Sequence, residues 1–284
     1  MPSLADYRTL GRSGLVICVM GLGTMTFDTP RRGSPDEVSE AVFDAYIEAG
    51  GNFVDTADVY AKGRGEELVG GYIAARGLRD RVVLATKPTF SVLPGDPNGG
   101  GNGRKHMFAA HAAPGPIAVQ MEYSLTERCV EWEHAHAARD CGLGITPWSP
   151  LAGGFLAGKY AREAKRASGE SRLAGASPFG DSKFTARNWR TLDARKAVAA
   201  EVGRPPSQVA LARLRARPGV TSTILGASKV EQLADNIASL GLDLVPEQPA
   251  ALDAADAPEA SFYAFFQPGL VNKYGFNAGV QGWR

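Results

Sequence analysis

Short apolar runs alternate with longer segments of helical periodicity along most of the chain. The clearest helix signal lies at 34–51, where Ser34 is suited to cap the N-terminus, Pro35 fits the first turn and Glu37 completes a capping box. The pair Gly50-Gly51 supplies a stop signal. One apolar face recurs inside this helix at the expected spacing, formed by Val38, Ala41, Val42, Ala45 and Ala49.

Further segments repeat the alternation. The stretch 7–18 is typical of a β-hairpin around GRSG, and the β-rich run VMGLGTM follows it. The sequence then predicts strands at 52–55, 82–86, 117–121, 143–147 and 221–225, and helices near 66–75, 128–138, 192–201 and 231–239. Strands that alternate with helices imply right-handed crossovers and a parallel sheet. Because these strands are short and apolar throughout, we expect both of their faces to be buried.

Polar residues at the carboxyl ends of these strands distinguish two parallel architectures. They are spread across the whole chain: Thr24, Asp55, Lys87, Gln120, Ser149 and Ser228. In a (β/α) barrel such strand ends converge on one mouth, where the active site is built. An open nucleotide-binding sheet instead carries a GxGxxG turn after its first strand, and GLGTM is not that motif. The sequence therefore favours an α/β fold with one barrel domain over 1–284, including a C-terminal tail at 241–284.

Composition narrows the function class. The 284 residues are 44% hydrophobic and 21% charged, with a net charge of +1, so the sequence gives no electrostatic reason to expect a nucleic acid or membrane partner. A small-molecule substrate is the better expectation. The three cysteines, Cys18, Cys129 and Cys141, fit neither a disulfide framework nor a metal site. The N-terminus lacks the pattern of a signal peptide, and we expect a cytoplasmic location.

Asp55, Tyr60 and Lys87 are the candidate catalytic residues, since each follows a short apolar run. A tyrosine with an ordinary pKa near ~10 donates a proton at neutral pH only if neighbouring charges assist it. An ammonium beside a phenol favours ionisation, and a carboxylate holds the ammonium in place. Such a trio suits proton donation to a carbonyl oxygen while a hydride reaches the carbon. The alternative is that Asp55 and Lys87 form only a structural ion pair.

Seven segments, in order, carry a resemblance to a known family. They are RTLGRSGLVICVMGLGTMTF, GGNFVDTADVY, VVLATK, GNGRKH, PIAVQMEYSL, ITPWSPLAGGFLAGKY and TSTILGASKVEQLADN. Together they resemble the aldo-keto reductases, specifically the bacterial and potassium-channel β-subunit-like branch. The resemblance implies a (β/α)8 TIM barrel that binds NADPH without a Rossmann domain and reduces aldehydes or ketones to alcohols.

The resemblance also implies roles for individual residues. Tyr60 is the expected general acid, with Lys87 beside it and Asp55 holding the lysine. The expected cofactor contacts are Thr24, Met25, Gln120, Trp148, Ser149, Pro150, Leu151, Ala152, Gly153, Lys159, Arg172, Gly226, Ser228, Lys229, Gln232, Asp235 and Asn236. Among these, Gln120 would bind the nicotinamide carboxamide, Trp148 would stack on its ring, and Lys229 is inferred to pair with a 2′-phosphate. Taken singly, Trp148 suits a core position, WSPLAGG a plain turn and GASKVEQ an ordinary helix cap.

One interval departs from the family pattern. Gln120 follows Lys87 by 120 − 87 = 33 positions, whereas a βαβ unit alone takes roughly 30 residues. The chain is therefore predicted to lack βα units 4 and 5, with a junction within 104–116, between about Ala110 and Pro116. A true internal deletion and a stretch missing from the sequence both account for this. If the deletion is real, we expect an open barrel that aggregates or forms homo-oligomers.

The family's catalytic histidine belongs to the missing part. The chain has four histidines, and each has a better structural or solvated explanation: His106, His111, His134 and His136. Three hypotheses follow: an NADPH-dependent carbonyl reductase, an NADP(H)-binding protein with little or no turnover, and an aldolase that uses Lys87 as a Schiff-base nucleophile. Tyr60 and the WSPLAGG segment argue against the third.

Overall fold

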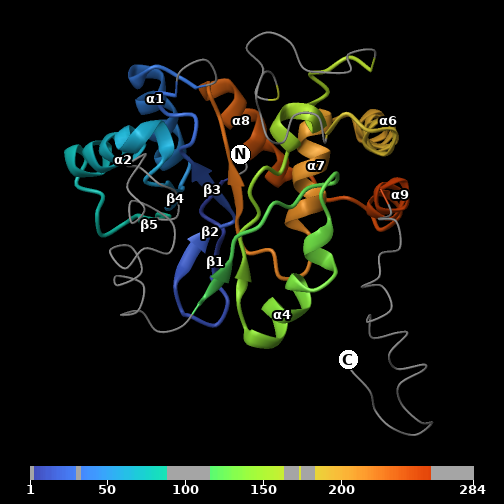
Figure 1. The fold of residues 1–284 in the computed structure, drawn as a ribbon, viewed down its shortest axis with the longest axis horizontal. Coiled ribbons are helices and arrows are strands. Elements are labelled where there is room, and N and C mark those ends of the chain that lie inside the picture. The colour runs from blue at the N-terminus through green and yellow to red at the C-terminus, as the bar shows by residue number, and fades with distance from the viewer. Residues whose placement is uncertain (1–2, 30–32, 88–115, 163–172, 174–182, 257–284) are drawn as a thin grey trace, which may run out of the picture.

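Six short parallel strands run through the middle of the computed structural model (Figure 1). The structure describes residues 3–29, 33–87, 116–162, 173 and 183–256. The strands are β3 (Met20–Gly23), β4 (Phe53–Asp55), β5 (Val83–Ala85), β6 (Ala118–Val119), β7 (Gly144–Ile145) and β8 (Thr223–Leu225). All six lie inside or beside the apolar runs that the sequence singles out, which confirms an α/β fold with parallel strands.

Backbone hydrogen bonds fix the order of the strands. The ladder β5-β4-β3-β8 forms one sheet, and β6 pairs with β7. The amides of Thr221 and Ile224 donate to the carbonyls of Ile145 and Pro147 at 2.9 and 2.8 Å, which joins β8 to β7. The full order is therefore β5-β4-β3-β8-β7-β6. No ladder pairs β5 with β6 among the described residues, so closure of the expected barrel is not seen there.

The sheet nevertheless curls strongly. Four strand-to-strand steps separate β4 from β6, and at ~4.8 Å a step a flat sheet would hold them roughly 19 Å apart. Yet Nε2 of Gln120, just past β6, lies 2.8 Å from Oδ1 of Asp55 at the end of β4. The carboxyl ends of the strands therefore converge, as predicted from the spread of their polar residues.

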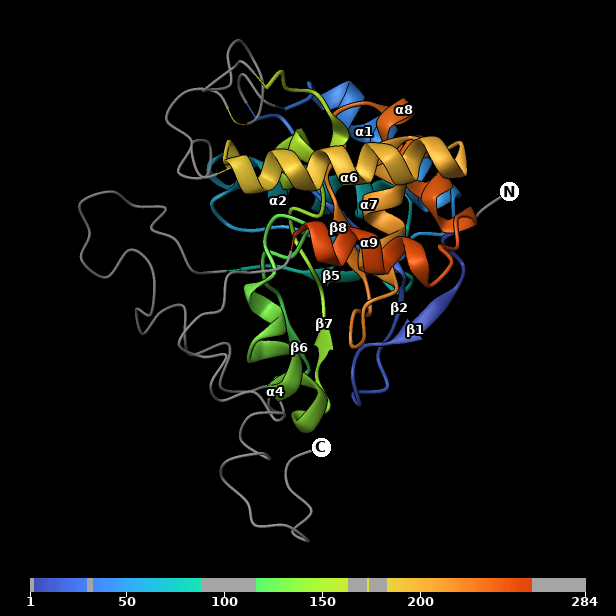
Figure 2. The ribbon, with the colours of Figure 1, turned by 90° about the vertical axis from the view of Figure 1, so that its right-hand side faces the viewer.

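Helices surround the strands (Figures 1 and 2). Those that pack with the first half of the sheet are α1 (Asp36–Glu48), α2 (Arg64–Ala75) and α8 (Val230–Ala238). The second half is accompanied by α4 (His134–Cys141), α6 (Ala186–Val202), α7 (Pro206–Arg215) and α9 (Glu247–Ala255). Short 3₁₀ segments lie at η1 (Tyr60–Gly63), η2 (Cys129–Glu131), η3 (Ala152–Ala157) and η4 (Ser239–Gly241). None of the described helices is long and apolar enough to cross a membrane.

The start of α1 differs from its prediction. The N-cap position is Pro35 and no side chain caps the helix, because the hydroxyl of Ser34 donates to the carbonyl of Ser228 at 2.9 Å instead. Ser34 is buried and ties α1 to the loop before α8. The expected stop is confirmed, since α1 ends at Glu48 and Gly50 adopts φ 93°.

The buried face of α1 is also rotated from the predicted one. Ala41 is exposed, and the residues in the core are Ser39, Val42, Phe43 and Tyr46. Aromatic side chains at 43 and 46 fill more of the space between α1 and the strands than alanines do, so they set the orientation of the helix.

An antiparallel hairpin precedes the sheet, as predicted for 7–18. It consists of β1 (Tyr7–Thr9) and β2 (Val16–Cys18), with Tyr7 opposite Cys18 and Thr9 opposite Val16. Because β2 leads directly into the amino end of β3, the hairpin lies at the end of the strands opposite the converging polar residues.

Candidate active site

A buried carboxylate organises the carboxyl ends of three strands. Asp55 is the last residue of β4, and its side chain is 4% exposed. Its Oδ2 lies 2.6 Å from Nζ of Lys87, two residues past β5, and its Oδ1 accepts from Nε2 of Gln120 at 2.8 Å. Nζ of Lys87 also donates to the carbonyl of Thr56 at 2.8 Å. These bonds fix the ammonium at one position, with 27% of the lysine side chain exposed.

Tyr60 completes the predicted trio. Nζ of Lys87 lies 5.3 Å from the centre of the Tyr60 ring, within the range of a cation–π contact. The turn that carries the tyrosine is strained, because Ala61 and Lys62 have φ of 48° and 58° and Gly63 has φ 95°. Non-glycine residues in this region cost free energy and persist where surrounding structure holds them, which is common near functional groups. The turn places Tyr60 between β4 and the start of α2.

The two expected cofactor contacts that follow β3, Thr24 and Met25, differ in how deeply they are buried. Thr24 is fully buried, and both its amide and its hydroxyl donate to the carbonyl of Asp55, at 3.0 and 3.2 Å. Its side chain therefore braces the end of β4. Met25 is 50% exposed. Of the two, Met25 is better placed for a contact with a ligand.

The segment after β7 forms a tight loop. Three consecutive positions, Ala152, Gly153 and Gly154, have positive φ of 49°, 64° and 92°, and Ser149 has φ 55°. Trp148 and Ser149 are half-buried, as are Leu151 and Gly153, whereas Pro150 is buried. A Cβ on Gly154 would lie 3.2 Å from Cδ of Lys159, so the lysine stem covers this glycine. The amides of Ala152 and Gly154 donate to the carbonyls of Ser149 and Leu151 at 2.9 Å each, so Lys159 is the group of this loop that suits an anion. Arg172 lies outside the described residues.

The predicted adenosine loop is held by its own side chains. Oε1 of Gln232 accepts from the amide and the hydroxyl of Ser228, at 3.0 and 3.2 Å. Gly226 and Lys229 are exposed at the start of α8, and no side chain caps that helix. Its first amides and the lysine together suit a phosphate.

Two residues of α8 that were expected to contact the cofactor form hydrogen bonds within the protein. Both carboxylate oxygens of Asp235 accept hydrogen bonds from α7, from Ser207 at 2.9 Å and Gln208 at 2.8 Å. Asn236 is buried, and its carbonyl accepts from Ser239. A cofactor contact for either stays a prediction.

A second buried ion pair lies near the same strand ends, and sequence reasoning missed it. Nζ of Lys183 lies 2.8 Å from Oε1 of Glu122, with 6% and 15% of the side chains exposed. Glu122 follows Gln120 by two positions and bridges Trp148 through the backbone. The acidic residue in QMEYSL was the available signal, but its partner lies 61 residues further along the chain, 183 − 122.

The described histidines do not reach this site. His134 and His136 are on α4, which follows β6 on the outside of the sheet, and neither has a buried side chain. His106 and His111 lie outside the described residues, as do the predicted junction at 104–116 and the predicted tail beyond 256, apart from Pro116 itself.

The fold is that of an α/β protein with parallel strands. A lysine, an aspartate and a tyrosine meet at the carboxyl ends of those strands, where α/β enzymes carry their active sites. The comparisons name the family. A model described as the Aldo/keto reductase family matches residues 19–107 and 100–257. The chain therefore belongs to the aldo/keto reductase family, a family of oxidoreductases.

Several curated proteins resemble the chain. A rice protein named "Probable voltage-gated potassium channel subunit beta" is 29% identical over 310 aligned positions, which cover 85% of this chain and 92% of the rice protein. The "Uncharacterized oxidoreductase YrpG" of Bacillus subtilis is 27% identical over 317 positions, with 85% and 93% covered. "Protein tas" of Escherichia coli is 36% identical over 155 positions, covering 52% and 42%.

Proposed function

We propose that the protein reduces an aldehyde or ketone to an alcohol with NADPH, by direct hydride transfer and with Tyr60 as the proton donor. The observation that carries the proposal is the placement of Lys87 between Asp55 and Tyr60. The carboxylate holds the ammonium against the Tyr60 ring, so a fixed positive charge lies beside the phenol that would donate the proton.

The residues present fit an NADPH molecule. Lys159, whose stem lies over Gly154, offers a cation for a diphosphate, and the start of α8 with Lys229 offers a second phosphate position. Bound NADPH would supply the hydride. The chain's own contribution is to hold the cofactor, to orient the carbonyl oxygen toward Tyr60 and to deliver the proton.

We also propose that the chain lacks two βα units of the family barrel. The alignment with the rice protein has 310 positions but includes only 85% of 284 residues, about 241, which leaves 310 − 241 = about 69 positions without a counterpart here. Two βα units of roughly 30 residues account for most of this number. The unpaired edges of β5 and β6 in the described structure support the same location.

A second candidate is an NADP(H)-binding protein with little or no turnover. The observation in its favour is the bond from Gln120 to Asp55, because it engages the amide expected to bind the nicotinamide. No histidine of the described residues joins the candidate site either. Losing one polar group that stabilises a developing oxyanion typically costs ~10²–10³ in rate, so the two candidates differ in degree.

The deciding experiment separates cofactor binding from turnover. NADPH is titrated into the purified protein while fluorescence is followed, and an aromatic aldehyde is then added while NADPH absorbance is recorded. Saturable binding with turnover supports the reductase. Tyr60→Phe should then lower kcat by about 10²–10⁴ and leave NADPH affinity unchanged. Tyr72→Phe on α2 is the matched control and should leave kcat unchanged.

Other outcomes point elsewhere. Binding without turnover supports the second candidate, and no saturable binding of NADPH contradicts both.

The cytoplasmic location, the preference for NADPH over NADH and the homo-oligomer remain proposals. Light scattering tests the last of these, and a stable monomer with cooperative melting would contradict it.

A further inference from the structure

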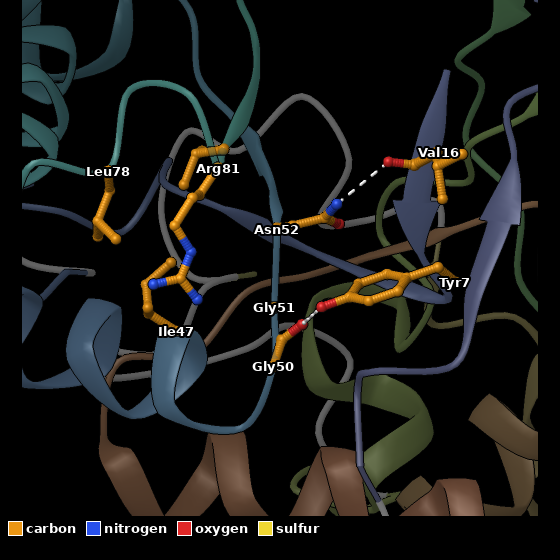
Figure 3. Close-up of a pocket in the computed structure, with 9 residues that line it drawn as sticks. Tyr7, Val16, Ile47, Gly50, Gly51, Asn52, Leu78 and Arg81 are labelled. Carbon is orange, nitrogen blue, oxygen red and sulfur yellow. Dashed lines mark hydrogen bonds between the residues drawn. The ribbon is translucent and has the colours of Figure 1, made fainter. Parts of the chain in front are cut away.

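A hollow lies at the end of the strands opposite the candidate active site (Figure 3). Its volume is about 320 Å³, at the small end of the range for ligand pockets. The hairpin forms one wall, and the end of α1, the start of β4 and the turn before β5 form the others. The lining residues are Tyr7, Val16, Ile47, Gly50, Gly51, Asn52, Leu78, Arg81 and Val82.

Most polar groups of this hollow are already engaged. The hydroxyl of Tyr7 donates to the carbonyl of Gly50 at 2.9 Å. The side chain of Asn52 donates to the carbonyl of Val16 at 3.1 Å and accepts from the amide of Cys18 at 2.8 Å. These bonds link the hairpin to the sheet and make the walls rigid, so they leave little capacity for a new ligand.

Arg81 is the exception. Its guanidinium has no ion pair and no side-chain hydrogen bond with any residue that the structure describes, whereas Nη1 of the neighbouring Arg79 reaches the carbonyl of Val82 at 3.5 Å. Figure 3 shows the guanidinium of Arg81 beside Ile47, facing across the hollow from Asn52 and Tyr7. Its backbone is fixed by a turn in which the amides of Arg81 and Val82 both donate to Leu78.

The remaining lining is apolar and partly open to solvent. Tyr7 is 44% exposed and Val16 is 46% exposed, which is unusual for large apolar side chains in the described part of the chain. Ile47 and Leu78 close the opposite side. An apolar wall that faces a guanidinium without a partner suits a ligand with an apolar body and an anionic end.

We propose that this hollow binds a small carboxylate with an aromatic or aliphatic body. The planar guanidinium of Arg81 matches the two oxygens of a carboxylate, and this paired geometry favours carboxylates over neutral isosteres. The body of the ligand would lie against Tyr7, Val16 and Leu78. This site is separate from the proposed reductase site and takes no part in hydride transfer.

The test uses benzoate as the probe and benzamide as its neutral counterpart, without NADPH. In ¹⁵N-labelled protein, benzoate should shift the backbone amide signals of Gly50, Gly51 and Asn52 in a saturable way. Benzamide should bind at least about tenfold more weakly, because it lacks the charge that Arg81 pairs with.

Two arginine variants make the result specific. Arg81→Gln should weaken benzoate binding about tenfold or more, whereas Arg79→Gln, the matched control on the same turn, should keep wild-type affinity. Both variants should retain the wild-type amide spectrum outside this turn, which shows that they fold. The proposal is overturned if benzoate causes no saturable shifts, if benzamide binds equally well or if Arg81→Gln keeps wild-type affinity. Because NADPH is absent, failure here leaves the reductase proposal untouched.

Discussion

Replacing Glu131 with glutamine should destabilise the fold strongly, because this carboxylate balances a group of arginines. Its Oε2 accepts from Arg128 at 2.7 Å, and its Oε1 lies 3.2 Å from Arg213 and 3.3 Å from Arg217. The hydroxyl of Tyr123 donates to the same Oε1 at 2.6 Å. The Glu131 side chain is 18% exposed, and that of Arg213 is 1% exposed. The group connects η2 with α7 and, through Asp253, with α9.

The pKa of Glu131 determines how much free energy of unfolding the Glu131→Gln variant should lose. Burial alone would raise this pKa, but the hydrogen bonds from Arg128 and Tyr123 and the charges of Arg128 and Arg213 outweigh it and lower the pKa to about 2. Against an ordinary value of 4.5, this corresponds to about 3 kcal/mol at neutral pH, since one pKa unit is worth about 1.36 kcal/mol. Breaking buried ion pairs by removing one partner typically costs 3–5 kcal/mol, which agrees.

The pH dependence gives the prediction its sign. A carboxyl group whose folded-state pKa is lowered stabilises the fold above its unfolded pKa, and this stability is lost as the pH falls toward the folded value. The free energy of unfolding of Glu131→Gln should therefore lie below that of the wild type by about 3 kcal/mol at pH 7 and by about 1–2 kcal/mol at pH 3. Urea unfolding at both pH values measures it.

A surface variant controls for general effects of charge removal. Asp243 pairs with Arg215, but its side chain is 95% exposed, so Asp243→Asn should leave unfolding unchanged. The reasoning fails if Glu131→Gln costs less than about 1 kcal/mol at pH 7, or if its deficit is the same at pH 3.

Two further predictions concern stability and are read by urea unfolding. A Cβ on Gly51 would enter the ring of Tyr46, so Gly51→Ala should cost about 1–3 kcal/mol, whereas Gly70→Ala, in the exposed interior of α2 with open space around it, should gain about 0.5–1 kcal/mol. Equal effects of the two alanines would contradict the packing around α1. Arg195 is fully buried, and none of its three guanidinium nitrogens has a hydrogen-bond partner. Burial lowers its pKa to about 9. Arg195→Met should therefore stabilise the fold by about 1–4 kcal/mol at pH 7, and a loss of stability would refute this. Because the folded pKa of Arg195 is lowered, the wild type should regain part of this difference only as the pH rises above about 9.

The strands were the most predictable elements. Each is a short apolar run bounded by polar or glycine residues, and that pattern is local and strong. The expected burial of both faces is confirmed for β3, β4, β7 and β8. It is wrong for β5 and β6, which are only partly buried, with Leu84 37% exposed, because these two strands form the edges of the described sheet. Helix α7 at Pro206–Arg215 was missed because the pair Pro205-Pro206 suggests a break, although proline is well tolerated in the first turn of a helix. Helix α9 was assigned to the tail because Glu247–Ala255 carries only a weak apolar face, and it depends on packing against α6.

The pairing of Asp55 with Lys87 was predictable, whereas the contact of Gln120 with Asp55 was not. Residues that end neighbouring parallel strands meet at one edge, and β4 and β5 are neighbours in the sequence and in the sheet. Gln120 ends a strand four places away from β4, so its distance from Asp55 depends on the curl of the whole sheet. No local pattern encodes that curl.

The bond between Gln120 and Asp55 is where the two candidate functions diverge. While Nε2 of Gln120 donates to Oδ1 of Asp55, the side-chain amide is held against the carboxylate, and its second N–H and its carbonyl are what it can offer a nicotinamide amide. A hydrogen bond to a charged group is worth about 1.5–3 kcal/mol, so a bound pose of the cofactor that breaks this bond would be weakened roughly 10- to 100-fold. If two strands are absent, as we propose, the closer approach of β6 to β4 is the physical cause of that bond. The loss of two strands, which removes the catalytic histidine expected from the family, would then also weaken the binding of the cofactor. Gln120→Met, which cannot make the bond, should therefore leave NADPH affinity equal to that of the wild type or higher, and a tenfold loss would show that Gln120 serves the nicotinamide after all.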